Sequence, residues 1–248
     1  MMKLEIQGLS KVGMERANNE DMISLGGILL RDDALAFPIE LDEESQFHLL
    51  VSDGMGGHEF GERASQELLE YLCECFKEER FRPESIEDDL RFHVKAFSDR
   101  LNHEASEEGQ LKPMGCTLTG VVWSQGKVYL LNAGDSRTYR FRNGILRQLT
   151  QDETLRAITG NPDDSKGLVN CIGAGCEGNL VVEDLSDRLS DGDELLICSD
   201  GLTDMVPDED IEKVLSNSEE PADELYAMAC RNGGYDNVSI IIAEMIGH

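Results

Sequence analysis

The sequence predicts an α+β fold in which antiparallel sheets form the core and helices cover them. Short apolar runs joined by tight turns predict hairpins, and Asn143-Gly144 is a strong hairpin turn before the run at 145–149. Helical patterns are grouped between these runs and do not alternate with them one by one, which argues against a βαβ plan. Two packed sheets with helices outside would bury every apolar stripe.

Short apolar runs bounded by turn residues give the individual strands. The first clear one is Phe47 to Val51, which ends at Asp53-Gly54. Residues 238–242 are apolar except for Ser239, which predicts a fully buried strand. The other strands are expected over 116–123, 127–133, 138–142, 145–149 and 194–198.

Apolar residues at helical spacing predict two long helices. Over 64–76 they alternate with glutamates, and over 86–101 they recur every three or four residues, so each helix has one buried stripe. Shorter helices are expected over 208–215 and 222–230, the second ending at Gly233-Gly234. The polar segment 150–166 is expected to be an irregular surface loop.

Length and composition describe a single globular domain. A chain of 248 residues without an internal repeat or a linker fits one domain over 1–248, and a hydrophobic fraction of 40% suffices for a core. No stretch approaches the ~18 apolar residues that span a bilayer. The N-terminal residues also lack the apolar core of a secretory signal, so we expect a cytoplasmic protein.

The cysteines and the net charge limit the possible environments and partners. The cysteine count is seven, an odd number with no Cys-x-x-Cys spacing, which predicts reduced and mostly buried thiols. A net charge of −28 argues against nucleic acids and anionic membranes as partners. If the substrate is an anion, bound cations must reverse the local charge.

Four short acidic motifs stand at the ends of expected strands, and a fifth acidic pair, Glu20-Asp21, lies near the N-terminus. Taken alone, each has a structural alternative, because Asp-Gly, Asp-Asn and Asp-Ser pairs also form turns. Together they predict carboxylates gathered around Mg²⁺ or Mn²⁺, which prefer oxygen ligands. The motifs are Glu20-Asp21, Asp53-Gly54, Asp135-Ser136, Asp200-Gly201 and Asp236-Asn237.

The segment from Asp53 to His58 has three glycines among residues 54–57, which costs backbone entropy unless a ligand approaches closely. A pair of divalent cations ~3.5–4 Å apart, bridged by one carboxylate, would offset the repulsion and lower the pKa of a bound water. Phosphoryl oxygens are the natural target. Arg16 supplies a bidentate phosphate ligand, although alone it could be a surface residue.

These motifs, in this order, resemble the metal-dependent Ser/Thr protein phosphatases of type 2C in their bacterial form. The resemblance extends from about residue 8 to residue 243. The matching segments are Arg16 to Asp21, Asp53 to His58, Gly115 to Leu118, Asn132 to Arg137, Cys198 to Leu202 and Gly234 to Ser239.

The resemblance implies a four-layer α-β-β-α sandwich with two central antiparallel sheets, and hydrolysis of phosphoserine and phosphothreonine in proteins. A metal-bridging water would attack phosphorus without a phosphoenzyme intermediate. It further implies phosphoprotein substrates, a cognate Ser/Thr kinase and a monomer. In the implied site, Asp53 bridges two metals, with Asp200 and Asp236 completing the first site and Glu20 and the Gly54 carbonyl serving the second. Asp21 lies in the outer shell, and Asp135 and Asp200 hold a weaker third ion. Arg16 binds the substrate phosphate.

The chain departs from the family pattern in three places. Met55 stands where eukaryotic relatives carry a His that is a proposed general acid, and we interpret the nearby His58 as a helix-start residue. Glu153 stands where many relatives have the His of Asp-His-Ser. The following flap, around 151–169, is shorter than in many bacterial relatives, which affects substrate preference and the third-metal site.

Two other classes of function compete with a phosphatase. A catalytically silent binding module would be expected to lose metal carboxylates, but Asp53, Asp200 and Asp236 are all present. A generic cation-binding protein would explain neither Arg16 nor the glycine-rich loop, and no stretch matches an EF-hand loop.

Overall fold

The computed structural model describes residues 1–57, 59–107 and 114–247, so the interpretation of His58 lies outside the described residues. Two six-stranded sheets and one three-stranded sheet form the centre of the molecule, and every strand pair in them is antiparallel. In order, the first sheet consists of β11 (Ile145–Gln148), β10 (Arg137–Arg142), β14 (Glu194–Cys198), β15 (Val238–Ile246), β1 (Met2–Lys11) and β4 (Asp33–Leu41).

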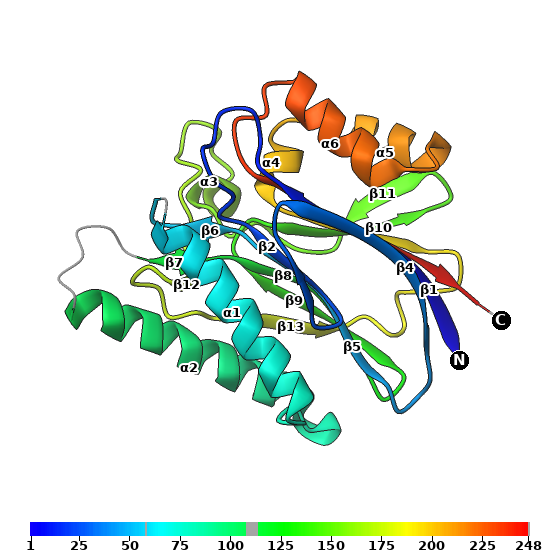
Figure 1. Ribbon diagram of the computed structural model, residues 1–248, viewed down its shortest axis with the longest axis horizontal. Coiled ribbons are helices and arrows are strands. Elements are labelled where there is room, and N and C mark those ends of the chain that lie inside the picture. The colour runs from blue at the N-terminus through cyan, green and yellow to red at the C-terminus, as the bar shows by residue number, and fades with distance from the viewer. Residues whose placement is uncertain (58, 108–113, 248) are drawn as a thin grey trace.

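The second large sheet packs against the first, and the small sheet lies beside one end of it (Figure 1). Its strands are β13 (Val181–Asp184), β9 (Lys127–Ala133), β8 (Leu118–Ser124), β5 (Gln46–Ser52), β2 (Met22–Leu25) and β3 (Ile28–Leu30). The small sheet consists of β12 (Ile172–Gly173), β7 (Gly115–Cys116) and β6 (Gly54–Met55).

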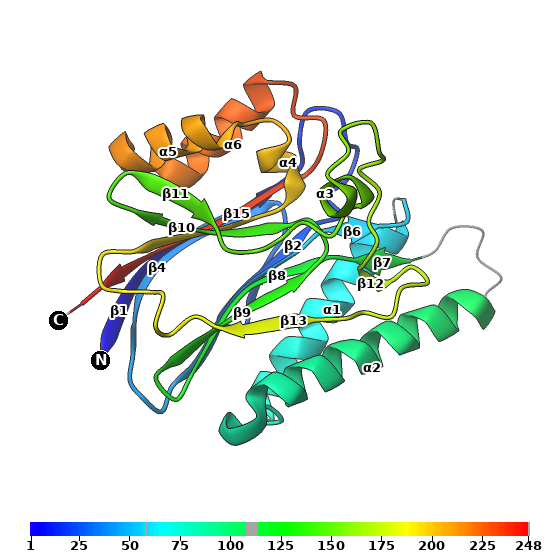
Figure 2. The same ribbon diagram turned by 180° about the vertical axis from the view of Figure 1, so that it is seen from behind.

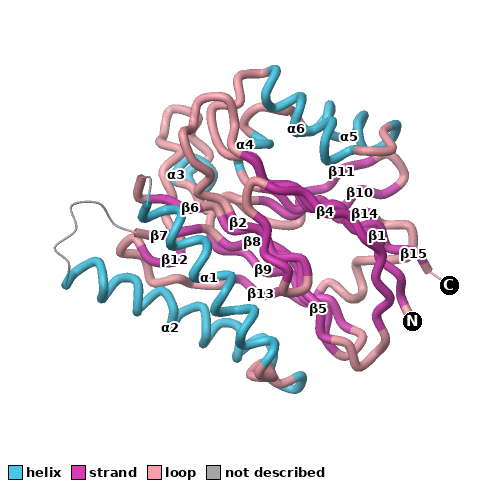
Figure 3. Tube along the Cα trace, viewed as in Figure 1, coloured by secondary structure: helices cyan, strands magenta, loops and turns pink. Residues whose placement is uncertain are grey.

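Helices form the two outer layers (Figures 1 and 3). The second sheet is covered by α1 (Glu59–Lys77) and α2 (Ile86–Glu107), and the first by α5 (Asp208–Asn217) and α6 (Pro221–Arg231). This arrangement confirms the predicted α-β-β-α sandwich. The shorter helices are η1 (Pro83–Ser85), α3 (Leu155–Thr159) and α4 (Asp200–Thr203).

Central strands are buried on both faces, which explains their continuous apolar sequence. On β14, Leu195 and Ile197 pack between the sheets, whereas Leu196 and Cys198 pack beneath the helices. Successive side chains of a strand point to opposite faces, so both sets must be apolar. The first sheet therefore has a separate apolar cluster on each face, one beneath the helices and one between the two sheets.

The predicted elements are confirmed with two differences. The four predicted helices lie within α1, α2, α5 and α6, and Asn143 and Gly144 form their hairpin turn with φ of 52° and 77°. The predicted strand over 116–123 is divided at Thr117, which lies between β7 and β8. The predicted loop over 150–166 contains α3, a helix too short to give an apolar periodicity. Of the helices described, none is long and apolar enough to cross a bilayer.

Three glutamates lie side by side across the first sheet. Glu194 on β14 is opposite Glu244 on β15, which is opposite Glu5 on β1. Burial and the charge of Glu244 raise the pKa of Glu194 to about 7. Its buried Oε1 atom has no hydrogen-bond partner within the described part of the chain. The ionised form of Glu194 is therefore unfavourable in the folded protein.

We expect Glu194→Gln to stabilise the protein at pH 8 and to have little effect at pH 5. The pKa of Glu194 in the folded state is raised above its ordinary value of 4.5. The contribution of Glu194 to stability is therefore complete below pH 4.5 and is lost as the pH rises through 7. The gain at pH 8 should be about 1–2 kcal/mol, after a discount for partial exposure. Urea unfolding at both pH values measures it. Glu5→Gln is the control, because the charge of Glu5 already pairs with Lys3 at 2.6 Å. Equal gains from Glu194→Gln at both pH values would contradict the prediction.

Candidate active site

The acidic residues of the second sheet lie at one edge of it because of strand direction. Strands β5 and β9 both pair antiparallel with β8, so they run the same way and end at the same edge. Asp53 follows β5 and Asp135 follows β9 at that edge. Since β2 is antiparallel to β5 and begins there, Glu20 and Asp21, which precede β2, join them.

The first sheet supplies the other two aspartates by the same rule. Strand β14 ends where its antiparallel neighbour β15 begins. Asp200 is the first residue of α4, just after β14, and Asp236 lies just before β15. The edge that carries these residues is at the end of the sandwich opposite the chain termini (Figures 1 and 2). Antiparallel topology thus brings residues from distant parts of the sequence together.

A pocket of about 350 Å³ opens at this edge. It contains each predicted metal-binding residue except Asp21, together with Arg16. Asp21 is buried, and its Oδ2 accepts a hydrogen bond of 2.8 Å from Ser199 Oγ. The polar and charged residues of the pocket are Arg16, Glu20, Asp53, Thr117, Asp135, Lys166, Asp200, Asp236 and Asn237, and its backbone includes 54–57 and 167–168.

Burial and neighbouring carboxylates raise the pKa of three aspartates of the pocket. Burial, followed by the charges of Asp21 and Asp200, raises the pKa of Asp53 well above its ordinary value. Burial and the charge of Asp135 raise the pKa of Asp200 to about 8, and burial raises that of Asp135 to about 6. Such a cluster favours a bound positive charge.

Arg16 provides one positive charge directly, because its Nη2 lies 2.6 Å from Asp236 Oδ2. Within the described ranges, no group of three or more Asp, Glu, His or Cys side chains is arranged so that it could hold a metal ion. The donors nevertheless fit a hard divalent cation in kind, since they are carboxylates and a backbone carbonyl. A cation at Asp236 would replace Arg16, which would leave the guanidinium available for an anion.

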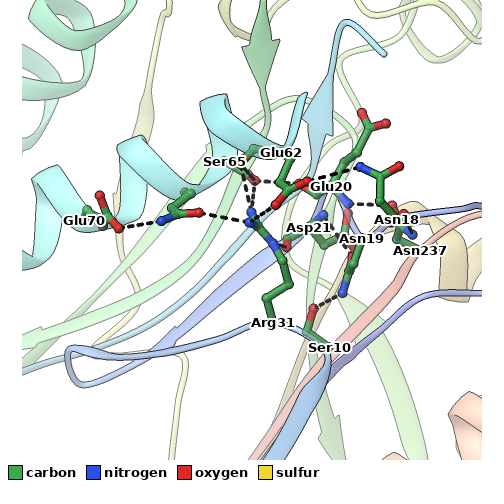
Figure 4. A network of polar contacts seen from close by, with 11 residues as sticks. Ser10, Asn18, Asn19, Glu20, Asp21, Arg31, Glu62, Ser65, Glu70 and Asn237 are labelled. Carbon is green, nitrogen blue, oxygen red and sulfur yellow. Dashed lines mark hydrogen bonds and ion pairs between the residues drawn. The ribbon is translucent and has the colours of Figure 1, made fainter. Parts of the chain in front are cut away.

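A buried polar network fixes the loop that carries Glu20 and Asp21 (Figure 4). Asn237 Oδ1 accepts a hydrogen bond from Glu20 N, and Asn237 Nδ2 donates to the Asn18 carbonyl, both at 2.9 Å. From the other side, Arg31 Nε donates to the Asp21 carbonyl at 2.9 Å. Arg31 was not among the predicted site residues, because no local motif marks it.

Thr117 fixes Asp53, and its role explains the break between β7 and β8. Its backbone N–H donates to the Asp53 carbonyl at 2.8 Å, and its Oγ1 accepts from Asp53 N at 3.0 Å. The Ser136 hydroxyl contacts the same Oγ1 at 2.7 Å. Thr117 therefore links the loops that carry Asp53 and Asp135, which the sequence motif alone did not indicate.

Close backbone packing sets the distance between the two aspartates of the first sheet. A Cβ atom on Gly201 would lie 1.9 Å from the Asn237 carbonyl oxygen. Any side chain at Gly201 would therefore separate α4 from the loop before β15. Glycine at this position keeps Asp200 and Asp236 on adjoining backbone segments.

The flap is anchored to the loop that carries Asp135. Glu153 Oε2 accepts hydrogen bonds of 2.8 Å from Gly134 N and from Asn170 Nδ2, which joins the two ends of the flap. At the flap's far end, Lys166 Nζ lies 2.7 Å from both oxygens of Asp204. Glu153, which stands where many relatives carry His, thus has a structural contact of its own.

We expect Glu153→Ala to lower the free energy of unfolding by about 1–3 kcal/mol, because the backbone N–H of Gly134 loses its acceptor. Glu153→Gln keeps an acceptor oxygen and should lose less. Chemical denaturation of both variants measures the difference. Glu177→Ala is the matched control, since this exposed glutamate makes only a 3.4 Å contact with Asn179 in the described structure. Equal losses in Glu153→Ala and Glu177→Ala would show that the anchor is unimportant.

Comparisons with known proteins agree with this geometry. A family model described as protein phosphatase 2C matches residues 27–230. The serine/threonine phosphatase stp of Listeria monocytogenes is 33% identical over 219 residues, covering 82% of this chain and 86% of the relative. The serine/threonine protein phosphatase PstP of Mycobacterium tuberculosis is 34% identical over 246 residues, covering 95% of this chain and 44% of the relative.

Solved structures give the same result. The catalytic domain of PstP in complex with 2 manganese ions superimposes with a TM-score of 0.76 at 30% identity, covering 100% of both chains. The phosphatase Stp1 from Staphylococcus aureus gives a TM-score of 0.78 at 27% identity, covering 100% of this chain and 96% of the other.

Proposed function

The chain belongs to the protein phosphatase 2C family and is a protein serine/threonine phosphatase, and we propose that it hydrolyses phosphoserine and phosphothreonine with bound divalent cations. The observation that carries this proposal is the composition of one pocket. Carboxylates from both large sheets and one guanidinium converge there: Glu20, Asp53, Asp135, Asp200, Asp236 and Arg16.

The proposed cation ligands follow from the position of each donor. Asp53 lies among the other carboxylates and would be shared between two cations, with Asp200 and Asp236 on one side and Glu20 with the Gly54 carbonyl on the other. Asp135 and Asp200 both line the pocket, and burial together with the charge of Asp135 raises the pKa of Asp200, so these two residues are the proposed ligands of a weaker third ion. Mg²⁺ and Mn²⁺ both accept these oxygen donors. When bound, such cations polarise phosphoryl oxygens and lower the pKa of water.

Arg16 is the proposed phosphate ligand. Its side chain lines the pocket, is 47% exposed and already pairs with an anionic oxygen of Asp236. Planar guanidinium groups bind phosphate through two parallel hydrogen bonds. In this proposal Arg16 exchanges Asp236 for the substrate phosphate, which orients phosphorus over the carboxylates.

Water is the proposed nucleophile, without a phosphoenzyme intermediate. Among the described residues that line the pocket there is no Ser, Cys or His. The Thr117 hydroxyl is engaged by Asp53 N and by Ser136, which supports its structural role. We propose that the partners are phosphoproteins and the kinase that phosphorylates them, and that the protein acts as a monomer.

The test is hydrolysis of a phosphothreonine peptide by the purified protein with Mn²⁺, with Mg²⁺ and with EDTA. We expect phosphate release with a divalent cation and none with EDTA, because the carboxylate cluster alone repels an anionic substrate. Asp53→Asn protein is the control for a contaminating phosphatase. If the protein binds Mn²⁺ but releases no phosphate with any divalent cation, it is a binding module and the proposal is wrong.

A further inference from the structure

Two free thiols touch each other beside the flap. The Sγ atoms of Cys171 and Cys176 lie 3.0 Å apart. Cys171 is buried and Cys176 is partly exposed, so an oxidant in solution meets Cys176 first. A disulfide has an S–S distance of about 2.05 Å. An approach of roughly 1 Å would therefore bond the two sulfurs.

A tight left-handed turn brings these thiols together. Gly173, Ala174 and Gly175 all have positive φ, at 79°, 50° and 84°, which reverses the chain between the two cysteines. Cys176 N donates to the Gly173 carbonyl at 2.8 Å, and Ala174 N donates to the Met114 carbonyl at 2.7 Å. Because a left-handed alanine costs about 1–2 kcal/mol, these contacts hold a conformation that a free chain would avoid.

Helix α2 holds the same turn from outside. Asn102 Nδ2 donates to the Cys176 carbonyl at 2.8 Å, and Ser98 Oγ accepts from Gly173 N at 2.9 Å. The backbone on both sides of the sulfurs is therefore fixed to the core. The contact between the two thiols is a feature of a packed turn and not of a free loop.

The turn is connected to the active site through the small sheet. Ile172 on β12 and Gly54 on β6 are both paired with Cys116 on β7, one on each side. With strands ~4.8 Å apart, Ile172 lies roughly 10 Å from the backbone that carries the Gly54 carbonyl. Asn170, next to Cys171, also donates to Glu153, the anchor of the flap.

We propose that Cys171 and Cys176 are a redox modification site, at which hydrogen peroxide forms a reversible disulfide that lowers phosphatase activity. The peroxide oxidises the Cys176 thiol to a sulfenic acid and is reduced to water. The Cys171 sulfur then attacks the sulfenic sulfur, its proton is lost, and the hydroxyl leaves as a second water. A dithiol reverses the bond by thiol–disulfide exchange and is itself oxidised.

The expected loss of activity follows from the connection to Gly54, and this part of the inference rests on the proposed function. Bond formation shifts the end of β12, and β7 transmits part of the shift to β6. Since a displacement of ~1 Å in an active site can lower a rate ~10²-fold, we expect an attenuated drop of roughly three- to tenfold in kcat. Reduction should restore the rate fully.

Peptide mass measurement tests the modification independently of activity. The sequence has no Lys or Arg between Lys166 and Arg188, so trypsin leaves both cysteines in the peptide 167–188. After hydrogen peroxide and alkylation of free thiols, we expect this peptide to be unalkylated and lighter by two hydrogens. Dithiothreitol treatment before alkylation should return the doubly alkylated form.

Variants separate this pair from other thiols. Cys176→Ser should keep its activity in peroxide, whereas Cys230→Ser, which removes a partly exposed thiol on α6, should lose activity as the wild type does. Cys171→Ser lacks the second thiol, so Cys176 should oxidise further, beyond recovery by dithiothreitol. Activity is measured on the phosphothreonine peptide with Mn²⁺.

Each negative result is distinct. If peroxide leaves two alkylatable thiols in the peptide 167–188, or takes Cys176 directly to a sulfinic acid, the modification site is wrong. If the disulfide forms and kcat is unchanged, the connection to the active site is wrong. If the reduced protein has no activity, the proposed function fails, while the peptide mass still decides whether the two cysteines pair.

Discussion

Replacing Asp53 with asparagine should abolish phosphatase activity and raise the thermal stability of the cation-free protein. Asp53 lies among the carboxylates of Asp21, Asp200, Asp236 and Asp135, whose charges all raise its pKa. In the proposed site Asp53 is shared between cations, and an amide carries no charge to hold them. We expect kcat/KM on a phosphothreonine peptide to fall by roughly 10³-fold or more.

The expected gain in stability and the expected loss of activity in Asp53→Asn protein have the same cause, the charge of Asp53. Burial and neighbouring carboxylates raise the pKa of Asp53 above its ordinary value of 3.8. Its contribution to stability is therefore complete below that value and lost as pH rises, so at neutral pH the ionised group is unfavourable. Asparagine keeps the shape and removes the charge. Residues that serve function at the expense of stability behave in this way.

Thermal unfolding at neutral pH with EDTA and with Mn²⁺ tests both effects. Wild-type protein should gain stability from Mn²⁺, because a cation that binds only the folded state raises the melting temperature. The variant should melt higher in EDTA and gain less from Mn²⁺. Asp187→Asn, a change at an exposed aspartate, should alter neither value. Near wild-type turnover in Asp53→Asn protein would exclude Asp53 from the chemistry.

The sequence predicted Asp53, Asp135, Asp200 and Asp236 because each lies beside a strand that is itself a local signal. Glu20 precedes β2, a four-residue strand that was not predicted, and only the family resemblance assigned it to the site. The apolar runs before Asp53 and Asp200, and the run after Asp236, set strand ends within a few residues. Antiparallel pairing then brings those ends to one edge. Residue positions along a strand are local information, so these aspartates could be identified without knowledge of the side-chain packing.

The supporting contacts could not be predicted, because they join residues that no local pattern relates. Arg31 reaches the Asp21 carbonyl and also Glu62 on α1, at a separation of 31 residues. Arg16 pairs with Asp236 across 220 residues. The contact between Cys171 and Cys176 is close in sequence, but it depends on consecutive positive φ angles that spacing does not reveal.

Replacing Arg16 with alanine should weaken phosphate binding and leave cation binding intact. The loss of a charge-assisted contact of about 1.5–3 kcal/mol corresponds to roughly 10- to 100-fold in kcat/KM, mostly through KM. Inhibition by inorganic phosphate should weaken in the same proportion. Arg16→Lys should recover only part of the loss, because an ammonium group keeps the positive charge but lacks the second parallel donor.

Cation affinity separates this role from a structural one. Arg16 Nη2 lies 2.6 Å from Asp236 Oδ2, so the guanidinium competes with a cation for that carboxylate. Arg16→Ala should therefore bind Mn²⁺ at least as tightly as wild type, as titration calorimetry would measure. Arg156→Ala, on the exposed surface of the flap, is the control and should change neither KM nor Mn²⁺ affinity. If Arg16→Ala instead weakened Mn²⁺ binding and lowered kcat at constant KM, the guanidinium would order the carboxylates and would not bind the substrate phosphate.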